Sequence, residues 1–280
     1  PLSYLADVYG PRLTGSPNFR AAAEWCIKKL TEWGVENAKL EPWGTFCHGW
    51  SVEKFSIEMV VPQYMRLIAY PKAWIPSTNG VISGHPVVVE IKSKDDFDKY
   101  RGTLGGGIVM NGRLKVTNPH FEADARRLSE ETLMEREGAI NTGMSDSYAE
   151  VMKMENEFLK EEDEINQFFC DEGIAVLLEP SSRDHGVVRV TTQTYRLNTD
   201  LTFPAIVVAR EHYGRILRIL EKDIPVQLNI NVQTVSHEDS IGYNVIAEIP
   251  GSGRKLKDEV VMLGGHLDSW HSGTGCNRQR

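Results

Sequence analysis

The chain has 280 residues, of which 41% are hydrophobic and 25% charged. These proportions are typical of a globular protein with room for about two domains. The formal net charge is −8 and no block of Lys or Arg forms a basic stripe, which argues against nucleic acid and anionic membrane surfaces as partners.

No apolar run reaches the length of a membrane span, and no signal peptide is visible in a chain that starts with Pro1 rather than Met. The four cysteines show no C-x-x-C spacing, which argues against a zinc knuckle or a redox pair. We expect them to be buried thiols.

The first predicted element is a helix in "RLTGSPNFRAAAEWCIKKLTEWG" (residues 12–34). Ser16 is the expected N-cap, Pro17 occupies the first turn, and Gly34 ends the helix. Its inward face is expected to carry Phe19, Ala22, Ala23, Cys26, Ile27, Leu30 and Trp33.

Short β-rich runs separated by Pro and Gly follow between about 55 and 112, and they indicate a small β-rich domain. The glycines of "GTLGGGIVMNG" precede a strand instead of opening a helix, so we interpret them as a turn and not as a phosphate loop. A charged helical stretch at about 119–172 interrupts this pattern. Its apolar stripe is interpreted as core packing and comprises Tyr148, Val151, Met152, Phe158, Leu159, Ile165, Phe168 and Phe169.

The β pattern resumes in "GIAVLLEP", "GVVRVTT" and "AIVVAR", and "EHYGRILRILEK" (residues 211–222) predicts a helix. The last three predicted strands are "VQLNINVQTV", "GYNVIAEIPGS" and "DEVVMLGGHLD", and we expect them to belong together. The third (residues 258–268) is almost continuously apolar, as in a strand buried on both faces of a sheet.

His266 and Asp268 would lie at the carboxyl end of that strand, where open α/β sheets place their ligands. Residues two apart in a strand point the same way, so the two side chains are expected to share a face. A carboxylate that accepts one ring N–H of an imidazole fixes its tautomer and leaves the other nitrogen free for a metal. The alternative is a hydrogen-bonded structural histidine, and a serine hydrolase built on Ser269 is disfavoured because no G-x-S-x-G occurs.

"NVIAEIPGS" and "DEVVMLGGHLDSWHSGTG" together resemble the start of the catalytic domain of the M28 family of metallopeptidases. "GPRLTGSPN" is similar to the segment that precedes this core, and the β-rich middle resembles an inserted protease-associated domain. The resemblance implies an α/β zinc-exopeptidase sheet of the phosphorylase/hydrolase type. The implied domains are 1–50 (helical part of the peptidase domain), 51–225 (protease-associated domain with the helical insertion at about 119–172) and 226–280 (first strands of the catalytic domain).

The resemblance also implies that His266 binds one zinc of a two-zinc site and that Asp268 orients it. Arg278 stands where the family has the Asp that bridges both metals, and the remaining ligands would lie further along. His271 and Cys276 are considered as substitute ligands and set aside, with a structural or substrate-side place expected for His271. A lone imidazole cannot hold a co-catalytic pair, so we expect this chain to be an inactive fragment of a zinc-dependent aminopeptidase or carboxypeptidase that acts on peptides.

A single-nucleotide frameshift is one hypothesis for the ending "CNRQR". A permitted spelling, TGC AAC CGA CAA CGC, reads Ala-Thr-Asp-Asn once its first T is deleted, and that is how the family continues this loop. Secretion or a periplasmic location is implied by the resemblance only. The alternative function is a non-catalytic module in which the protease-associated domain binds a partner.

Overall fold

The computed structural model describes most of the chain. The described residues are 2–112, 114, 121, 123, 125–138, 144–190, 200–238, 241–253, 255–256 and 259–273.

The helix α1 (Pro17–Glu32) begins and ends where the sequence predicts. The Ser16 hydroxyl accepts a hydrogen bond from the Phe19 N–H at 3.2 Å, and Gly34 follows the helix with φ +80°. This left-handed conformation is open to glycine at little cost, which explains why the helix stops there. The expected inward face is correct at its start but wrong at its end, because the Trp33 side chain is exposed.

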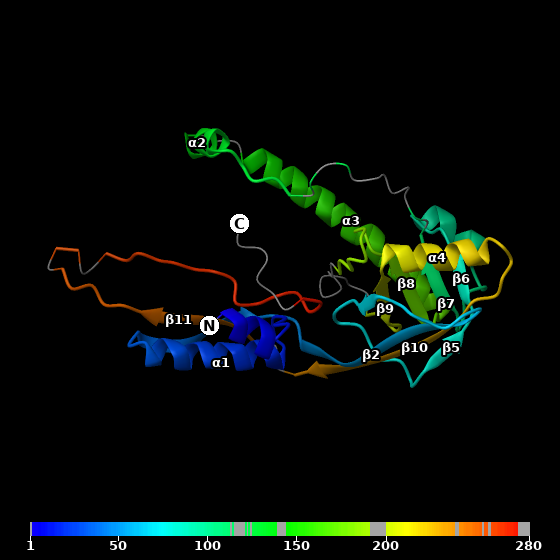
Figure 1. Ribbon diagram of the computed structural model, residues 1–280, viewed down its shortest axis with the longest axis horizontal. Coiled ribbons are helices and arrows are strands. Elements are labelled where there is room, and N and C mark those ends of the chain that lie inside the picture. Colours follow the sequence, from blue (N-terminus) through cyan, green and yellow to red (C-terminus); the bar gives the residue numbers. More distant parts are fainter. Residues whose placement is uncertain are drawn as a thin grey trace.

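The helix α1 packs on a two-stranded antiparallel ribbon made of β1 (Glu36–Thr45) and β11 (Ile241–Glu248). Figure 1 shows these elements together, with the described residues after β11 running back beside the N-terminal part of the chain. Residues near the two ends of the chain, 17–45 and 241–248, therefore form one unit.

A second, antiparallel sheet has the strand order β3-β2-β10-β5. Its members are β2 (Gly49–Val61), β3 (Met65–Arg66), β5 (Ile82–Gly84) and β10 (Gln227–His237). The long strands β2 and β10 pair along their whole length, from Gly49 opposite His237 to Val61 opposite Gln227.

A third, mixed sheet has the order β4-β9-β8-β7-β6. It comprises β4 (Ala69–Pro71), β6 (Pro86–Val89), β7 (Ile108–Asn111), β8 (Val176–Pro180) and β9 (Ala205–Val208). The four strands β6 to β9 are parallel, and only β4 runs against its neighbour. Their carboxyl ends therefore meet at one edge of the sheet.

Helices connect or follow the strands of the mixed sheet. They are α2 (Glu130–Gly138), α3 (Met144–Glu172), α4 (Arg210–Leu220) and the short 3-10 helix η2 (Lys94–Lys99), while a π-helical turn η1 (Tyr4–Val8) precedes α1. In Figure 1 the long helix α3 extends away from the sheets toward α2. Its C-terminal end is anchored, because Phe168 stacks on Phe97 of η2 with ring centroids 4.3 Å apart.

The antiparallel and mixed sheets share one hydrophobic core. Trp50, Ile57 and Ile230 from the antiparallel sheet belong to the same cluster as Val109 and Leu178 from the mixed sheet. Burying this apolar surface is the main force that holds the two sheets together.

Three expectations from the sequence need correction. The last three predicted strands do not lie together, because β10 pairs with β2 and β5, β11 pairs with β1, and 259–268 forms no strand. Residues 187–190 of "GVVRVTT" are also not a strand, and 191–192 lie outside the described residues. Among the described side chains of the apolar stripe on α3, Phe168 and Phe169 are buried and Ile165 packs against the core, whereas Val151 and Phe158 are exposed.

Two further findings concern membrane-spanning helices and cysteines. No helix among the described residues combines the length and apolar character needed to cross a membrane. Cys26, Cys47 and Cys170 are free thiols and are partly exposed, so the expectation of buried cysteines is wrong for these three.

Candidate metal centre

The segment that carries His266 is irregular and not a strand, contrary to the sequence prediction. The side chains of the apolar run that precedes it are 85% to 94% exposed, namely Val260, Val261, Met262 and Leu263. A buried strand needs neighbours for its backbone hydrogen bonds and cover for both faces. No strand in the described part of the chain pairs with this run.

The side chains of His266 and Asp268 nevertheless meet. The imidazole Nδ1 lies 2.8 Å from Asp268 Oδ1. A carboxylate in this position accepts the Nδ1–H, so the neutral ring carries its lone pair on Nε2. The His266 side chain is 88% exposed, and Nε2 is open to an incoming ligand.

The second oxygen of the Asp268 carboxylate is also used. Thr14 donates its hydroxyl hydrogen to Asp268 Oδ2, with a distance of 3.1 Å between the two oxygens. Asp268 thus accepts one hydrogen bond from the ring that it orients and another from the segment before α1. Two contacts fix the rotation of a carboxylate better than one.

The backbone around Asp268 is held by Arg12, which is 3% exposed. Its Nε donates to the carbonyl of Leu267 at 2.8 Å, and its Nη1 donates to the carbonyls of Leu5 and Gly10 at 2.6 and 2.7 Å. The backbone N–H of Arg12 donates to the Ser269 hydroxyl, and the Ser269 N–H returns a bond to the Arg12 carbonyl, both at 2.9 Å. The segment 267–269 is therefore attached to the N-terminal residues by a continuous set of hydrogen bonds.

His271 attaches the same loop to the sheets. Its Nε2 donates to the Pro71 carbonyl at 2.8 Å, and its ring packs edge-on against Trp50 with centroids 5.5 Å apart. The side chain is buried, and Nδ1 has no hydrogen-bond partner among the described residues. Burial lowers the pKa of His271 to about 4, against the opposing effect of the Pro71 carbonyl, so the ring is neutral at physiological pH.

The described residues contain no group of three or more His, Cys, Asp or Glu side chains that could hold a metal ion. His266 fits one zinc ligand position, because an exposed imidazole nitrogen whose partner nitrogen is bound by a carboxylate is the usual donor. Cys276 and Arg278 lie outside the described residues. The site therefore offers one oriented metal ligand, the His266 imidazole, and the hydrogen bonds that hold it in place.

Sequence reasoning missed Arg12 and Thr14 as parts of this site. Both lie in "GPRLTGSPN", which was noted only as similar to the segment before the catalytic core. No feature of one sequence shows that a threonine reaches a carboxylate 254 positions later. A buried arginine indicates many hydrogen-bond acceptors around it, but the sequence does not show that Arg12 is buried.

The fold is similar to part of a solved M28 peptidase. The structure matches a Peptidase M28 precursor from Shewanella amazonensis with a TM-score of 0.56 and 22% identity, over 98% of this chain and 54% of that one. No family model matches the chain.

The sequence is similar to carboxypeptidase Q. The identity is 33% over 276 residues for the Xenopus laevis protein and 24% over 277 residues for the Pongo abelii protein, in both cases 98% of this chain and 50% of the relative. The chain spans about half the length of these curated relatives. Together with the fold, this similarity confirms the resemblance to M28 metallopeptidases that the sequence motifs indicate.

Proposed function

We propose that this chain is part of a zinc-dependent exopeptidase that removes terminal residues from peptides. The observation that carries the proposal is the His266–Asp268 pair with its contact to Thr14. Similarity to carboxypeptidase Q over nearly the whole chain supports it.

In the proposed enzyme His266 is one ligand of a two-zinc site, and Asp268 orients its ring. Zinc supplies a Lewis acid for the scissile carbonyl and lowers the pKa of water at the site. Thr14 and Arg12 keep Asp268 and the backbone around it in place. The other ligands and the general base lie outside the described residues, so we propose that the chain by itself has no peptidase activity.

The protease-associated domain expected at 51–225 is proposed to comprise the two sheets between Gly49 and His237, inserted into the peptidase domain; β10, expected in the catalytic domain, is included because it pairs with β2. The shared core of these sheets supports a separate folding unit. The pairing of β2 with β10 supports an insertion, because the chain enters and leaves this unit on neighbouring strands. Secretion or a periplasmic location is proposed through the family resemblance, and fractionation of the source cells tests it.

The test of the proposed function uses the longer protein that contains this chain. We expect it to bind two zinc ions per molecule in a calorimetric titration and to release terminal residues from an unblocked peptide. The His266→Ala variant should lose both properties, while His48→Ala, which changes an exposed histidine outside the candidate site, should keep them. A longer protein that binds no zinc would contradict the proposal and favour a binding module without catalysis.

A further inference from the structure

A cavity of about 370 Å³ lies in the mixed sheet, away from His266. It is formed where β7 and β8 end and where α3 covers the neighbouring strand residues. Leu177, Glu179 and Val207 contribute from the strands, and Phe158, Ile165 and Phe169 contribute from α3. Crevices at the carboxyl ends of parallel strands are the usual ligand sites of α/β sheets, and the volume is at the lower end of small-ligand pockets.

A buried lysine with two carboxylates occupies the interior of this cavity. Lys72 Nζ lies 2.7 Å from Glu179 Oε2 and 3.3 Å from Glu162 Oε1. Burial opposes the charge of Lys72, but Glu179 and Glu162 outweigh it and hold the pKa of Lys72 above its ordinary value. The two carboxylates therefore favour the protonated form of Lys72, and the formal charges of the three side chains sum to −1.

The two carboxylates have acceptor capacity left. Neither Glu162 Oε2 nor Glu179 Oε1 accepts a hydrogen bond from any residue that the structure describes. Both side chains keep some exposure, 22% and 29%, in a cavity that they line. Unused acceptors with an excess negative charge are suited to an ammonium group.

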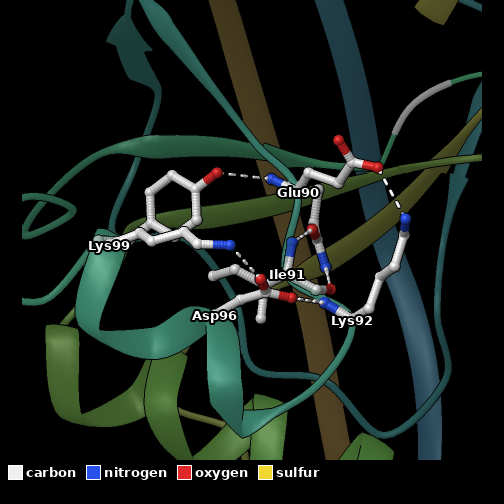
Figure 2. Close-up of polar contacts among 7 residues, drawn as sticks. Glu90, Ile91, Lys92, Asp96 and Lys99 are labelled. Carbon is white, nitrogen blue, oxygen red and sulfur yellow. Dashed lines mark hydrogen bonds and ion pairs between the residues drawn. The ribbon is translucent and has the colours of Figure 1, made fainter.

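The exposed part of the cavity lining carries two cations beside one carboxylate, Glu161. The two cations are Lys92 and Arg189. The loop after β6 holds Lys92 through two hydrogen bonds: the Ile91 N–H donates to Asn111 Oδ1 at 3.0 Å, and the Lys92 N–H donates to Asp96 Oδ2 at 3.1 Å. Figure 2 shows the contact between Lys92 and Asp96. The side chain of Lys92 contacts Glu90, but Glu90 does not line the cavity.

The uncharged part of the lining is both apolar and polar. The apolar side chains include Phe158, Ile165 and Phe169 of α3 with Leu177 and Val207, and the polar ones are Asn111, Asn166 and Ser182. A ligand that matches all three parts carries an ammonium group at one end, a carboxylate at the other and an apolar body between them.

We infer that this cavity binds a small zwitterion with an apolar body, either a free amino acid or a dipeptide. The ammonium group would lie against Glu162 and Glu179, and the carboxylate against Arg189 and Lys92. This site is separate from the candidate metal centre and does not depend on the proposed peptidase activity. Its ligand chemistry is that of an exopeptidase product or a short substrate.

Calorimetric titration of this chain tests the inference with four probes. L-leucine and alanyl-leucine carry both charges, N-acetyl-leucine lacks the cation, and leucinamide lacks the carboxylate. We expect at least one zwitterion to bind, and both blocked probes to bind at least tenfold more weakly. Tighter binding of leucine indicates a free amino acid as the ligand, and tighter binding of alanyl-leucine indicates a dipeptide.

Substitutions of residues that line the cavity test whether the ligand binds there. Glu162→Gln leaves Lys72 paired with Glu179, and Arg189→Gln changes an exposed side chain, so both should fold. Each should weaken binding about tenfold, since each removes one charged hydrogen bond. The matched controls Glu157→Gln on α3 and Arg183→Gln in the same loop do not line the cavity and should bind as the parent chain does.

The inference is overturned if neither zwitterion binds, if the blocked probes bind equally well, or if the control variants weaken binding as much as Glu162→Gln and Arg189→Gln. His266→Ala should leave the binding unchanged. Failure of the peptidase proposal and failure of this inference are therefore distinguished by different variants.

Discussion

Thr14 and Asp268 are in hydrogen-bond contact, 3.1 Å apart, although 254 positions separate them in the sequence. The contact joins the segment before α1 to the loop that carries His266. Because Asp268 also accepts from His266, the hydroxyl of Thr14 acts on the orientation of the imidazole without touching it. This makes Thr14 a positioning residue of the candidate metal centre.

Replacing Thr14 by Val removes the hydroxyl and keeps the shape of the side chain. We expect Asp268 to lose its fixed rotation and zinc affinity in the longer protein to fall about tenfold, as for other residues behind a metal ligand. Calorimetry measures the affinity, and nitrogen chemical shifts of the His266 ring measure its tautomer. Thr14→Ser should restore both values, and an unchanged affinity in Thr14→Val would contradict the role.

Replacing Arg12 by Met should loosen the loop 267–269. The partly buried carbonyls of Leu5, Gly10 and Leu267 would lose their donor, and each such loss costs about 1 kcal/mol or more. We expect the free energy of unfolding in urea to fall by about 3 kcal/mol or more, and exchange of the Ser269 amide hydrogen to accelerate. Arg20→Met is the control, because Arg20 is exposed and its ion pair with Glu24 contributes little. Equal losses of unfolding free energy in Arg12→Met and Arg20→Met would show that Arg12 does not hold the loop 267–269.

Stability should depend on pH through His271. Burial lowers its pKa to about 4 in the folded chain, whereas the ordinary value is 6.5, so between these values the unfolded chain binds a proton that the folded chain does not. The free energy of unfolding therefore has its full value above pH 6.5. It falls by about 3 kcal/mol in all as the pH falls toward 4. His271→Gln can still donate to the Pro71 carbonyl but does not titrate. Urea unfolding across this range should show a weaker pH dependence in His271→Gln than in His48→Gln, and identical slopes would refute the assignment.

A methyl group at Gly49 should be strongly destabilising. A Cβ built there would lie 2.1 Å from the Gly15 carbonyl oxygen, a backbone atom that cannot turn aside. Relief requires moving the Thr14–Ser16 segment or strand β2, so we expect Gly49→Ala to lower the free energy of unfolding by about 3 kcal/mol. Gly253→Ala is the matched control, because no atom lies within 4 Å of its added Cβ. Thermal unfolding of the two variants should differ clearly.

Local signals in the sequence were sufficient for elements with their own start and stop residues. Ser16 and Gly34 define α1 because a cap acts within one turn of the helix. The strict alternation at 226–235 likewise predicts β10, because a half-buried strand imposes a period of two on its own residues. Such signals need no knowledge of distant partners.

The errors concern environments that other parts of the chain create. The run Val260–Leu263 reads as a buried strand, yet its side chains are exposed because none of the described strands lies beside it. The expected contact between His266 and Asp268 occurs all the same, because two residues so close in sequence can meet without a sheet. Thr14 and Arg12 could not be found this way, since their contacts with the loop are entirely long-range.

The pairing of Gly49 with His237 has an energetic consequence. For the unit formed by α1, β1 and β11, the residues between Gly49 and His237 act as one long loop whose ends are held together by this pairing. The entropy lost on closing a flexible loop grows only with the logarithm of its length, by about 0.6 kcal/mol for each doubling. A large insertion at this point therefore adds little to the cost of folding the unit from which it emerges, provided that the inserted part folds by itself.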